Sequence, residues 1–537
     1  MNTIFKDKNG EAIYVLGLQA HNSSDGCWEM IDRSISAVKQ YHGNTLEVPV
    51  YWYQIEPEEG RFDLEMVKTL IRKVRGNGLH LIILWFGFSK NADLTYMPEW
   101  AKLDTSRFRL AVEPDGGVVP MMSVHCEETI EADKKAFVEL IRCIRAEDEK
   151  ERTVIAVQVE NEVGYYPIDR CYSKKAQEDF DRGVPKELDG VELEDSDAPM
   201  DGNSWHSRFG RYAHEAFSAW YFAKAIDKIA SAGKEIYPSL PFCTNTAVGE
   251  VRQQVGGQSY PSGAPVGRVL EIWQKGAPNI SAFGADIYQP HKSGYLATCR
   301  AHARLGNPLF IPETGTGGDG FAINHIHAAA DYGAIGICGF GAESTLDGEG
   351  KLTESSQKVA DTMEIIESMS PMLLRYAGTE KIFCVTQEEF QNLAYVKRKL
   401  YHITFYFTAL NEKGRPLGRS LRVCDKLAKD PEIFHQRGRA IIYETSPTEY
   451  YIAGVGFTAR FLRRTEPGDI FPGRTLYSRA ATELAALTIE EGYFTQDGDW
   501  VCEFVRRGDE IDCGAFVYPG IVLKVKLNPN VTASVEW

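Results

Sequence analysis

The chain has 537 residues and a formal net charge of −16, from 59 Lys and Arg against 75 Asp and Glu. This length exceeds what one hydrophobic core organises, so we expect two or three domains. An acidic chain lacks the positive surface that binds nucleic acid or an anionic membrane, so we expect neither partner. The 11 cysteines include no C-x-x-C pair, which argues against zinc ribbons and redox motifs.

The first ten residues lack the apolar core of a signal peptide, and no later stretch reaches the ~18 apolar residues that a membrane span needs. We therefore expect a cytoplasmic protein. The neighbouring residues His325 and His327 are spaced by two and do not share a helical face, so no metal site is expected there. We expect no metal and no cofactor, and the sequence leaves a homo-oligomer open.

Apolar runs of strand length alternate with helical patterns through the first 375 residues. Eight runs predict strands, at residues 13–18, 45–50, 79–85, 153–159, 240–244, 280–287, 309–311 and 334–340. Helices are predicted after them, at about 27–41, 64–77, 132–148, 207–233, 267–275, 293–304, 321–332 and 354–368. Eight alternating units predict a (β/α)8 TIM barrel, α/β in class, over residues 1–375.

The pattern changes near residue 376. Short strand-like runs follow without helices between them, at 383–386, 393–396, 400–410, 439–444, 449–462, 499–506 and 520–528. They predict a C-terminal all-β domain, a β-sandwich, over residues 376–537. Its aromatic residues suit a structural core, an oligomer interface or a substrate subsite equally well. The longest interruption of the barrel, residues 165–206, is either a wall of the active-site mouth or a solvated loop.

Two of the predicted barrel strands end in an acid. Glu162 follows the fourth strand, and Glu313 follows the seventh. Because all strand ends of a (β/α)8 barrel meet at one mouth, we expect these two carboxylates to converge. Such a pair suits cleavage of a glycosidic bond, since one acid protonates the leaving oxygen and the other attacks the sugar. The alternative is that each Glu only caps a loop or pairs with an Arg. This alternative is weaker when both residues lie at strand ends of the same barrel.

These motifs resemble the retaining glycosidases of the large (β/α)8 clan, in which the acid/base follows an Asn and the nucleophile ends strand seven. Residues 158–164 resemble more specifically family 35 glycoside hydrolases, the β-galactosidases. Residues 17–24, 51–63, 84–91 and 440–461 resemble the bacterial branch with a C-terminal β-sandwich. The resemblance implies Glu162 as acid/base and Glu313 as nucleophile, with Asn161 bound to the sugar's 2-hydroxyl.

Further residues at predicted strand tips are candidates for substrate binding. Trp52, Trp85 and Tyr288 each close a strand on the mouth side, where a ring can stack on a sugar face, and Tyr288 can also bond Glu313. Core packing is the alternative for each ring. Asn22 and Glu56 lie at the first two strand tips, where they bind either sugar hydroxyls or other buried polar groups.

One departure from family 35 bears on specificity. Several members carry Asn-Ala-Glu after strand three, whereas this chain continues from Trp85 through Lys90 without that motif. Galactose and glucose differ only at the C4 hydroxyl, and the sequence does not locate its partner. The two acids and the family resemblance make a β-galactosidase the leading hypothesis. The missing motif leaves a β-glucosidase or a transglycosylase as alternatives. A non-catalytic carbohydrate-binding protein is a remote alternative, since both acids are present.

Overall fold

The computed structural model describes residues 3–247, 255–407, 429, 436–463, 486–512 and 514–530. The chain divides into two compact units, of which one covers Asn2–Thr316 and Ala334–Lys351 and the other Gly317–Gly333 and Leu352–Trp537. The second unit includes two helices, α11 (Asp319–Ala330) and α12 (Glu354–Tyr376), that we had placed with the barrel by their position in the sequence. The domain boundary at residue 375 stays a prediction.

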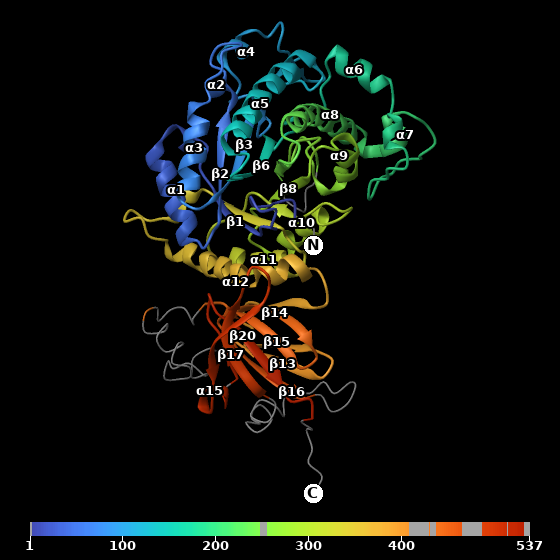
Figure 1. The fold of residues 1–537 in the computed structure, drawn as a ribbon. Coiled ribbons are helices and arrows are strands. Elements are labelled where there is room, and N and C mark those ends of the chain that lie inside the picture. Colours follow the sequence, from blue (N-terminus) through green and yellow to red (C-terminus); the bar gives the residue numbers. More distant parts are fainter. Residues whose placement is uncertain are drawn as a thin grey trace. The chain divides into compact units, whose positions relative to one another are not determined.

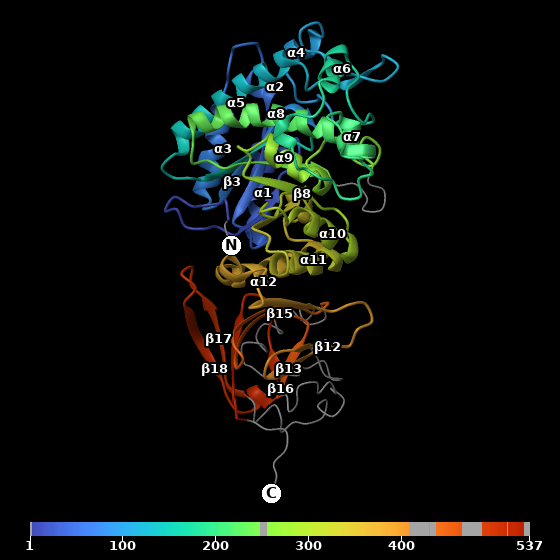
Figure 2. The same ribbon diagram turned by 90° about the vertical axis from the view of Figure 1, so that its right-hand side faces the viewer.

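The first unit contains an eight-stranded parallel sheet in the order β8-β7-β6-β3-β2-β1-β10-β9. Strands of this sheet, among them β3 and β8, are labelled in Figures 1 and 2. Its strands are β1 (Val15–Gln19), β2 (Thr45–Tyr51), β3 (His80–Lys90), β6 (Val154–Asn161), β7 (Phe242–Ala247), β8 (Ala282–Asp286), β9 (Phe310–Ile311) and β10 (Gly336–Phe340). The two outermost strands, β8 and β9, are joined by a parallel bridge between Ile287 and Thr314. The sheet is therefore a nearly closed barrel, and the predicted fold class is confirmed.

Helices cover the outside of the strands in Figure 1. They are α1 (Trp28–Gln40), α3 (Glu65–Gly76), α5 (Glu127–Asp148), α8 (Ala213–Ile236), α9 (Leu270–Gly276) and α10 (Lys292–His302). Each buries one stripe. In α3, for example, the buried side chains recur at spacings of three and four, at Val67, Leu70, Ile71 and Val74. This spacing is the reason that the helices were visible in the sequence.

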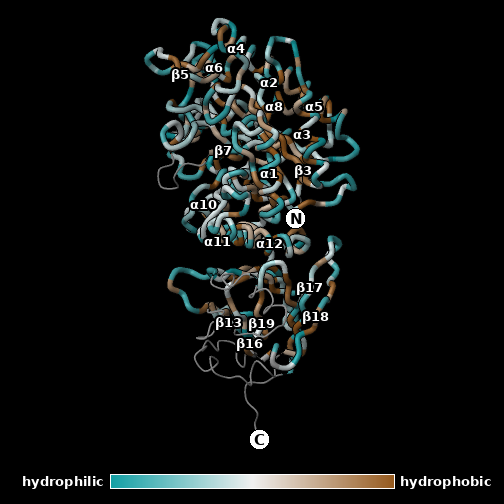
Figure 3. Tube along the Cα trace, turned by 90° about the vertical axis from the view of Figure 1, so that its left-hand side faces the viewer, coloured by the Kyte–Doolittle hydropathy of each residue, from teal (hydrophilic) through white to brown (hydrophobic). Residues whose placement is uncertain are grey.

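The barrel strands are apolar on both faces, because one face packs inside the barrel and the other under the helices. Every residue of β1, β2 and β6 is buried. Figure 3 shows brown, hydrophobic stretches along strands such as β3, whereas outer loops are largely teal. Polar residues at the ends of such strands consequently stand out.

The insertion after the fourth barrel strand folds into helical segments, α6 (Lys174–Asp181) and α7 (Trp205–Phe209). Trp205 and Phe209 are almost completely buried. The Arg170 guanidinium lies 4.0 Å from the ring centre of Tyr172. The segment is thus a packed element of the unit, and its contact with a ligand stays a prediction.

The second unit contains two antiparallel sheets, ordered β11-β14-β15-β20-β17-β18 and β12-β13-β16-β19. The strands are β11 (Ile382–Thr386), β12 (Leu393–Lys397), β13 (Tyr401–Tyr406), β14 (Arg439–Ser446), β15 (Glu449–Val455), β16 (Thr458–Arg463), β17 (Ala486–Phe494), β18 (Trp500–Arg506), β19 (Ala515–Phe516) and β20 (Val522–Leu527). The ring of Tyr450 in the first sheet packs 5.3 Å from that of Phe461 in the second. The predicted all-β region is confirmed.

Two details of this region differ from the predicted strands. The run 449–462 is two strands, because Gly456 adopts a positive φ of 73° and turns the chain between β15 and β16. The strands β17 and β19 were missed. The end of the predicted strand 400–410 lies outside the described residues. Across the part of the chain that is described, no helix combines the length and apolarity needed to cross a membrane.

Candidate active site

Three carboxylates converge where barrel strands end. Glu162 follows β6, Asp286 closes β8, and Glu313 follows β9. One oxygen from each lies within 4.8 Å of one oxygen from each of the others. All three residues are buried. The expected meeting of Glu162 and Glu313 is therefore present in the geometry, together with a third acid that the sequence analysis did not single out.

Glu313 is held by three hydrogen-bond donors. Its Oε1 accepts from Gln19 Nε2 at 3.1 Å and from Asn161 Nδ2 at 3.2 Å. Its Oε2 accepts from the Tyr288 hydroxyl at 2.7 Å. These donors come from three different strand ends, so the carboxylate is fixed in one orientation before any substrate arrives.

Glu162 has a perturbed acidity. Burial, and next the negative charge of Glu313, raise the pKa of Glu162 to about 7, while Lys90 and a hydrogen bond with Asp286 oppose the rise. Its backbone is left-handed, with φ 47°, and its N–H donates to Asn245 Oδ1 at 3.0 Å. Such backbone conformations in residues other than glycine are concentrated at functional sites. Near neutral pH this carboxyl group is poised to give or take a proton.

Lys90 orients the Asn161 amide. Lys90 closes β3 and is buried, and its Nζ lies 2.7 Å from Asn161 Oδ1. Because the ammonium group donates to the amide oxygen, the Asn161 NH₂ group is directed to Glu313. Lys90 lies in the stretch 84–91, and we had given it no role. A lysine at the end of a largely apolar strand was the available signal.

Asn245 and Asp286 were also missed. Asn245 Nδ2 donates to Asp286 Oδ2 at 2.7 Å, so the amide bridges the Glu162 backbone and the third acid. Burial, followed by the charges of Glu313 and Glu162, holds the pKa of Asp286 well above its usual range. Asn245 lies between two threonines of β7, and Asp286 closes the otherwise apolar β8. We had ended the β7 strand at residue 244, one position too early to include Asn245.

The structure places Trp85 away from the three acids. The side chain is fully buried, its Nε1 donates to Asp133 Oδ1 at 2.8 Å, and its ring packs edge-on against Phe137. Both partners belong to α5. Trp85 thus packs in the core between strand and helix, as the alternative to sugar stacking had it. Its ring offers no open face for a sugar.

Trp52 and Glu56 pair with each other and are not brought to the acids. Trp52 is fully buried, and its Nε1 donates to Glu56 Oε2 at 2.7 Å. The second oxygen of Glu56 accepts the Gly60 N–H at 2.6 Å. The pair stabilises the segment that follows β2. Glu56 therefore bonds other buried polar groups, which was the alternative to sugar binding.

Tyr288 is the predicted aromatic residue that does join the acids, and 46% of it is exposed. Its ring packs edge-on against Phe340, which also contacts the His21 ring. Asn22, next to His21, is half-buried, and its Oδ1 has no hydrogen-bond partner among the described residues. The cluster therefore offers one accessible ring beside Glu313.

Glu160 has a separate task. Its Oε2 accepts the backbone N–H groups of Gly87 at 3.2 Å and Ser89 at 2.8 Å. Burial raises the pKa of its neighbour Asp133 to about 6, and burial together with the charge of Asp133 holds the pKa of Glu160 well above its usual range. Glu160 therefore anchors the end of β3 that carries Lys90.

Two family models match the chain. Glyco_hydro_42, described as beta-galactosidase, matches residues 22–212, and a domain of unknown function, DUF5597, matches residues 359–518. The first match includes Asn161 and Glu162 and ends before Glu313. A search of curated proteins gives no match.

Solved structures resemble the barrel. The β-galactosidase from Rahnella sp. R3 has a TM-score of 0.51 and 15% identity, covering 69% of this chain and 58% of that one. The β-galactosidase from Bacillus circulans sp. alkalophilus has a TM-score of 0.51 and 14% identity, covering 70% of this chain and 58% of that one. The chain thus spans 58% of the length of each, and this likeness establishes the fold.

The matches support a retaining (β/α)8 glycosidase. The family model that matches the barrel region is Glyco_hydro_42, so the placement in family 35 is not confirmed and stays a prediction.

Proposed function

We propose that the protein is a retaining exo-β-glycosidase that removes terminal β-linked sugars, with β-galactosides as the preferred substrates. The observation that carries the proposal is the buried pair Glu162 and Glu313, with oxygens within 4.8 Å. Carboxyl groups of retaining enzymes lie ~5–5.5 Å apart, whereas inverting enzymes need ~6.5–9.5 Å to admit water between them. The short separation supports the retaining mechanism.

In the first half of the reaction, protonated Glu162 gives its proton to the glycosidic oxygen as the bond to the anomeric carbon breaks. The Glu313 carboxylate attacks that carbon from the opposite face and forms a covalent glycosyl-enzyme. The leaving alcohol carries away the proton. The raised pKa of Glu162 supports this role, because a general acid must still hold its proton near neutral pH.

In the second half, ionised Glu162 takes a proton from water, and the hydroxide oxygen attacks the anomeric carbon. The bond to Glu313 breaks, the electron pair returns to that carboxylate, and the sugar leaves with its original β configuration. Two inversions give net retention. The two carboxylates and water account for every bond change, so we propose no cofactor.

Three neighbours support this chemistry. Tyr288 and Gln19 hold the two oxygens of Glu313. Asn161 is placed to bond the 2-hydroxyl of the sugar, a contact that strengthens as charge develops in the transition state. Lys90 keeps the Asn161 amide in the required orientation.

The sugar preference rests on the description of the matching family model, beta-galactosidase. A β-glucosidase or a transglycosylase would use the same two carboxylates, and the resemblance to family 35 also concerns β-galactosidases. A cytoplasmic location and a homo-oligomer stay predictions from the sequence.

A panel of aryl β-glycosides tests the proposal. We expect the aryl β-galactoside to be cleaved fastest, with β-galactose as the first product detected by proton NMR. The variant Glu162→Gln should lose most of the activity on substrates with poor leaving groups, and Glu349→Gln, at an exposed carboxylate, serves as the matched control. Absence of turnover on every sugar, or α-galactose as the first product, would refute the proposal.

A further inference from the structure

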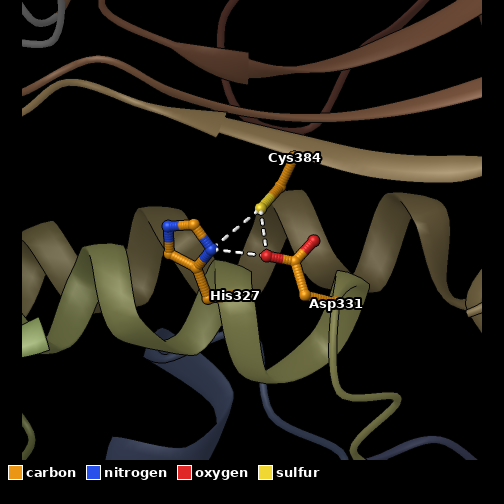
Figure 4. A group of neighbouring side chains, drawn as sticks. All are labelled: His327, Asp331 and Cys384. Atoms are coloured by element: carbon orange, nitrogen blue, oxygen red, sulfur yellow. Dashed lines mark hydrogen bonds and ion pairs between the residues drawn. The ribbon is translucent and has the colours of Figure 1, made fainter. Parts of the chain in front are cut away.

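A second cluster of metal-binding side chains lies in the unit that holds the two antiparallel sheets. His327 lies on α11, Asp331 follows the end of that helix, and Cys384 lies on β11 (Figure 4). His327 Nδ1 lies 2.7 Å from Asp331 Oδ2 and 3.2 Å from Cys384 Sγ. Cys384 Sγ lies 3.4 Å from the same Asp331 oxygen. Three different donor atoms thus form one small triangle.

The triangle has nearly the size that a tetrahedral metal ion requires. With Zn–N of ~2.0–2.1 Å, Zn–O of ~2.0–2.2 Å and Zn–S of ~2.3 Å, tetrahedral ligand atoms lie roughly 3.3–3.6 Å from one another. The observed edges of 2.7, 3.2 and 3.4 Å are slightly shorter, because shared protons join the atoms in place of a cation. A metal ion would replace these protons after only a small outward movement.

The orientation of the His327 ring is set by its other nitrogen. Nε2 lies 2.9 Å from Thr386 Oγ1, two residues beyond Cys384 on β11. A histidine that binds a metal through one nitrogen usually donates its other N–H to such a neighbour, which fixes the tautomer and the ring plane. The Thr386 hydroxyl is placed to accept that proton and so leaves Nδ1 to the cation.

The cluster is open on one side. His327 is buried, Cys384 is half-buried, and the Asp331 side chain is 41% exposed. A cation can therefore enter past Asp331, and a water molecule can complete a tetrahedral set. Thiolate, imidazole and carboxylate together favour Zn²⁺ over Mg²⁺ or Ca²⁺, which prefer oxygen alone.

We propose that His327 Nδ1, Asp331 Oδ2 and Cys384 Sγ bind one zinc-type divalent transition metal, with water as the fourth ligand. Binding releases the Cys384 thiol proton, because the thiolate is the ligand. The ion would join α11 to β11 and stabilise the packing of helix against sheet. We had expected no metal near His327 because its spacing from His325 does not suit a shared ligand set. The partners in the structure are instead Asp331, four positions later, and Cys384, 57 positions later.

Cobalt titration of the full chain tests the site. After treatment with a chelator and a reductant, we expect Co²⁺ to bind with one-to-one stoichiometry and to give a thiolate-to-cobalt charge-transfer band in the near ultraviolet, with visible bands typical of tetrahedral cobalt. Zn²⁺ should abolish the bands by competition. No charge-transfer band, or bands typical of octahedral cobalt bound by oxygen alone, would overturn the proposal, leaving a hydrogen-bonded cluster.

Variants identify the thiolate. Cys384→Ser should remove the charge-transfer band, whereas Cys502→Ser, which changes an exposed thiol in the same unit, should retain it. Thr386→Val should keep the band and weaken cobalt binding about 10–100-fold. Asp331→Asn changes an exposed position, so the variant should fold, and its apparent affinity should fall. A band that survives in Cys384→Ser would place the cobalt at another cysteine and contradict the assignment.

Discussion

Lys90 donates from Nζ to Asn161 Oδ1 at 2.7 Å. This contact connects the end of β3 to the residue that precedes the proposed acid/base, and it directs the Asn161 NH₂ group to Glu313 at 3.2 Å. The same ammonium group lowers the pKa of Glu162, although burial and Glu313 dominate. One buried cation therefore affects both the geometry and the acidity of the site.

Replacement of this lysine should change rate and pH dependence together. Lys90→Met removes a charged hydrogen bond worth about 1.5–3 kcal/mol, so kcat/KM should fall about 10–100-fold. The pKa of Glu162 should rise, because the cation that lowers it is gone, and the alkaline limb of the pH profile should move to higher pH. Lys351→Met, at an exposed lysine, is the control. An unchanged alkaline limb would contradict the role of Lys90.

The unmodified enzyme should lose activity as pH rises through about 7. Glu162 must be protonated to act as the acid, and its pKa is raised to about 7. Because Glu162, Asp286 and Glu313 interact, the measured value belongs to the group rather than to one residue. The measurement is kcat/KM between about pH 5 and pH 9. A rate that rises throughout this range would show that Glu162 does not donate a proton.

Removal of the Tyr288 hydroxyl should affect the nucleophile. Tyr288→Phe keeps the ring beside Phe340 and removes the 2.7 Å hydrogen bond to Glu313. We expect kcat to fall about 10–100-fold, since hydrogen bonds to charged groups contribute about 1.5–3 kcal/mol, with a smaller change in KM. Tyr493→Phe, at a tyrosine 45% exposed, is the control. If kcat were equal in both variants and the parent, Tyr288 would have no part in holding Glu313.

The buried Glu160 and Asp133 pair should make stability depend on pH. The pKa values of both groups are raised, so the folded state keeps a proton that the unfolded chain releases above about pH 4. Stability is therefore greatest below the unfolded pKa values and decreases as pH rises through about 6, by up to ~1.4 kcal/mol per pH unit for each proton.

Glu160→Gln should weaken this pH dependence. The Gln carbonyl can accept the N–H groups of Gly87 and Ser89, and its NH₂ can donate to Asp133. Urea unfolding at several pH values should show a smaller decrease for the variant than for the parent. In contrast, Glu160→Ala leaves two buried N–H groups without this partner, at about 1–3 kcal/mol each. Equal pH dependence in the parent and the Gln variant would disprove the raised pKa of Glu160.

The sequence predicted the barrel well, because each strand is apolar on both faces and each helix has a buried stripe. It also predicted that Glu162 and Glu313 would meet, since a barrel brings all its strand ends to one mouth. The sequence pattern did not predict which way the Trp52 and Trp85 side chains point. An aromatic residue at a strand tip faces either the mouth or the helices, and the sequence pattern is apolar in both cases.

Other residues depend on contacts that only tertiary structure fixes. Glu160 and Glu162 both have positive φ values, 60° and 47°, so the regular alternation of a strand fails at the motif. Lys90, Asn245 and Asp286 come from three strands far apart in the chain, and nothing in the local sequence relates them. Cys384 lies 57 positions from His327.

Chemical rescue distinguishes the roles of Glu313 and Glu162. Glu313→Gly removes the proposed nucleophile, so hydrolysis of an activated aryl β-galactoside should be lost, and added azide should restore turnover by attacking from the vacated face. We expect an α-glycosyl azide from this variant, and a β-glycosyl azide from Glu162→Ala, in which Glu313 still forms the covalent intermediate. A β-glycosyl azide from Glu313→Gly would contradict the assignment of Glu313 as the nucleophile.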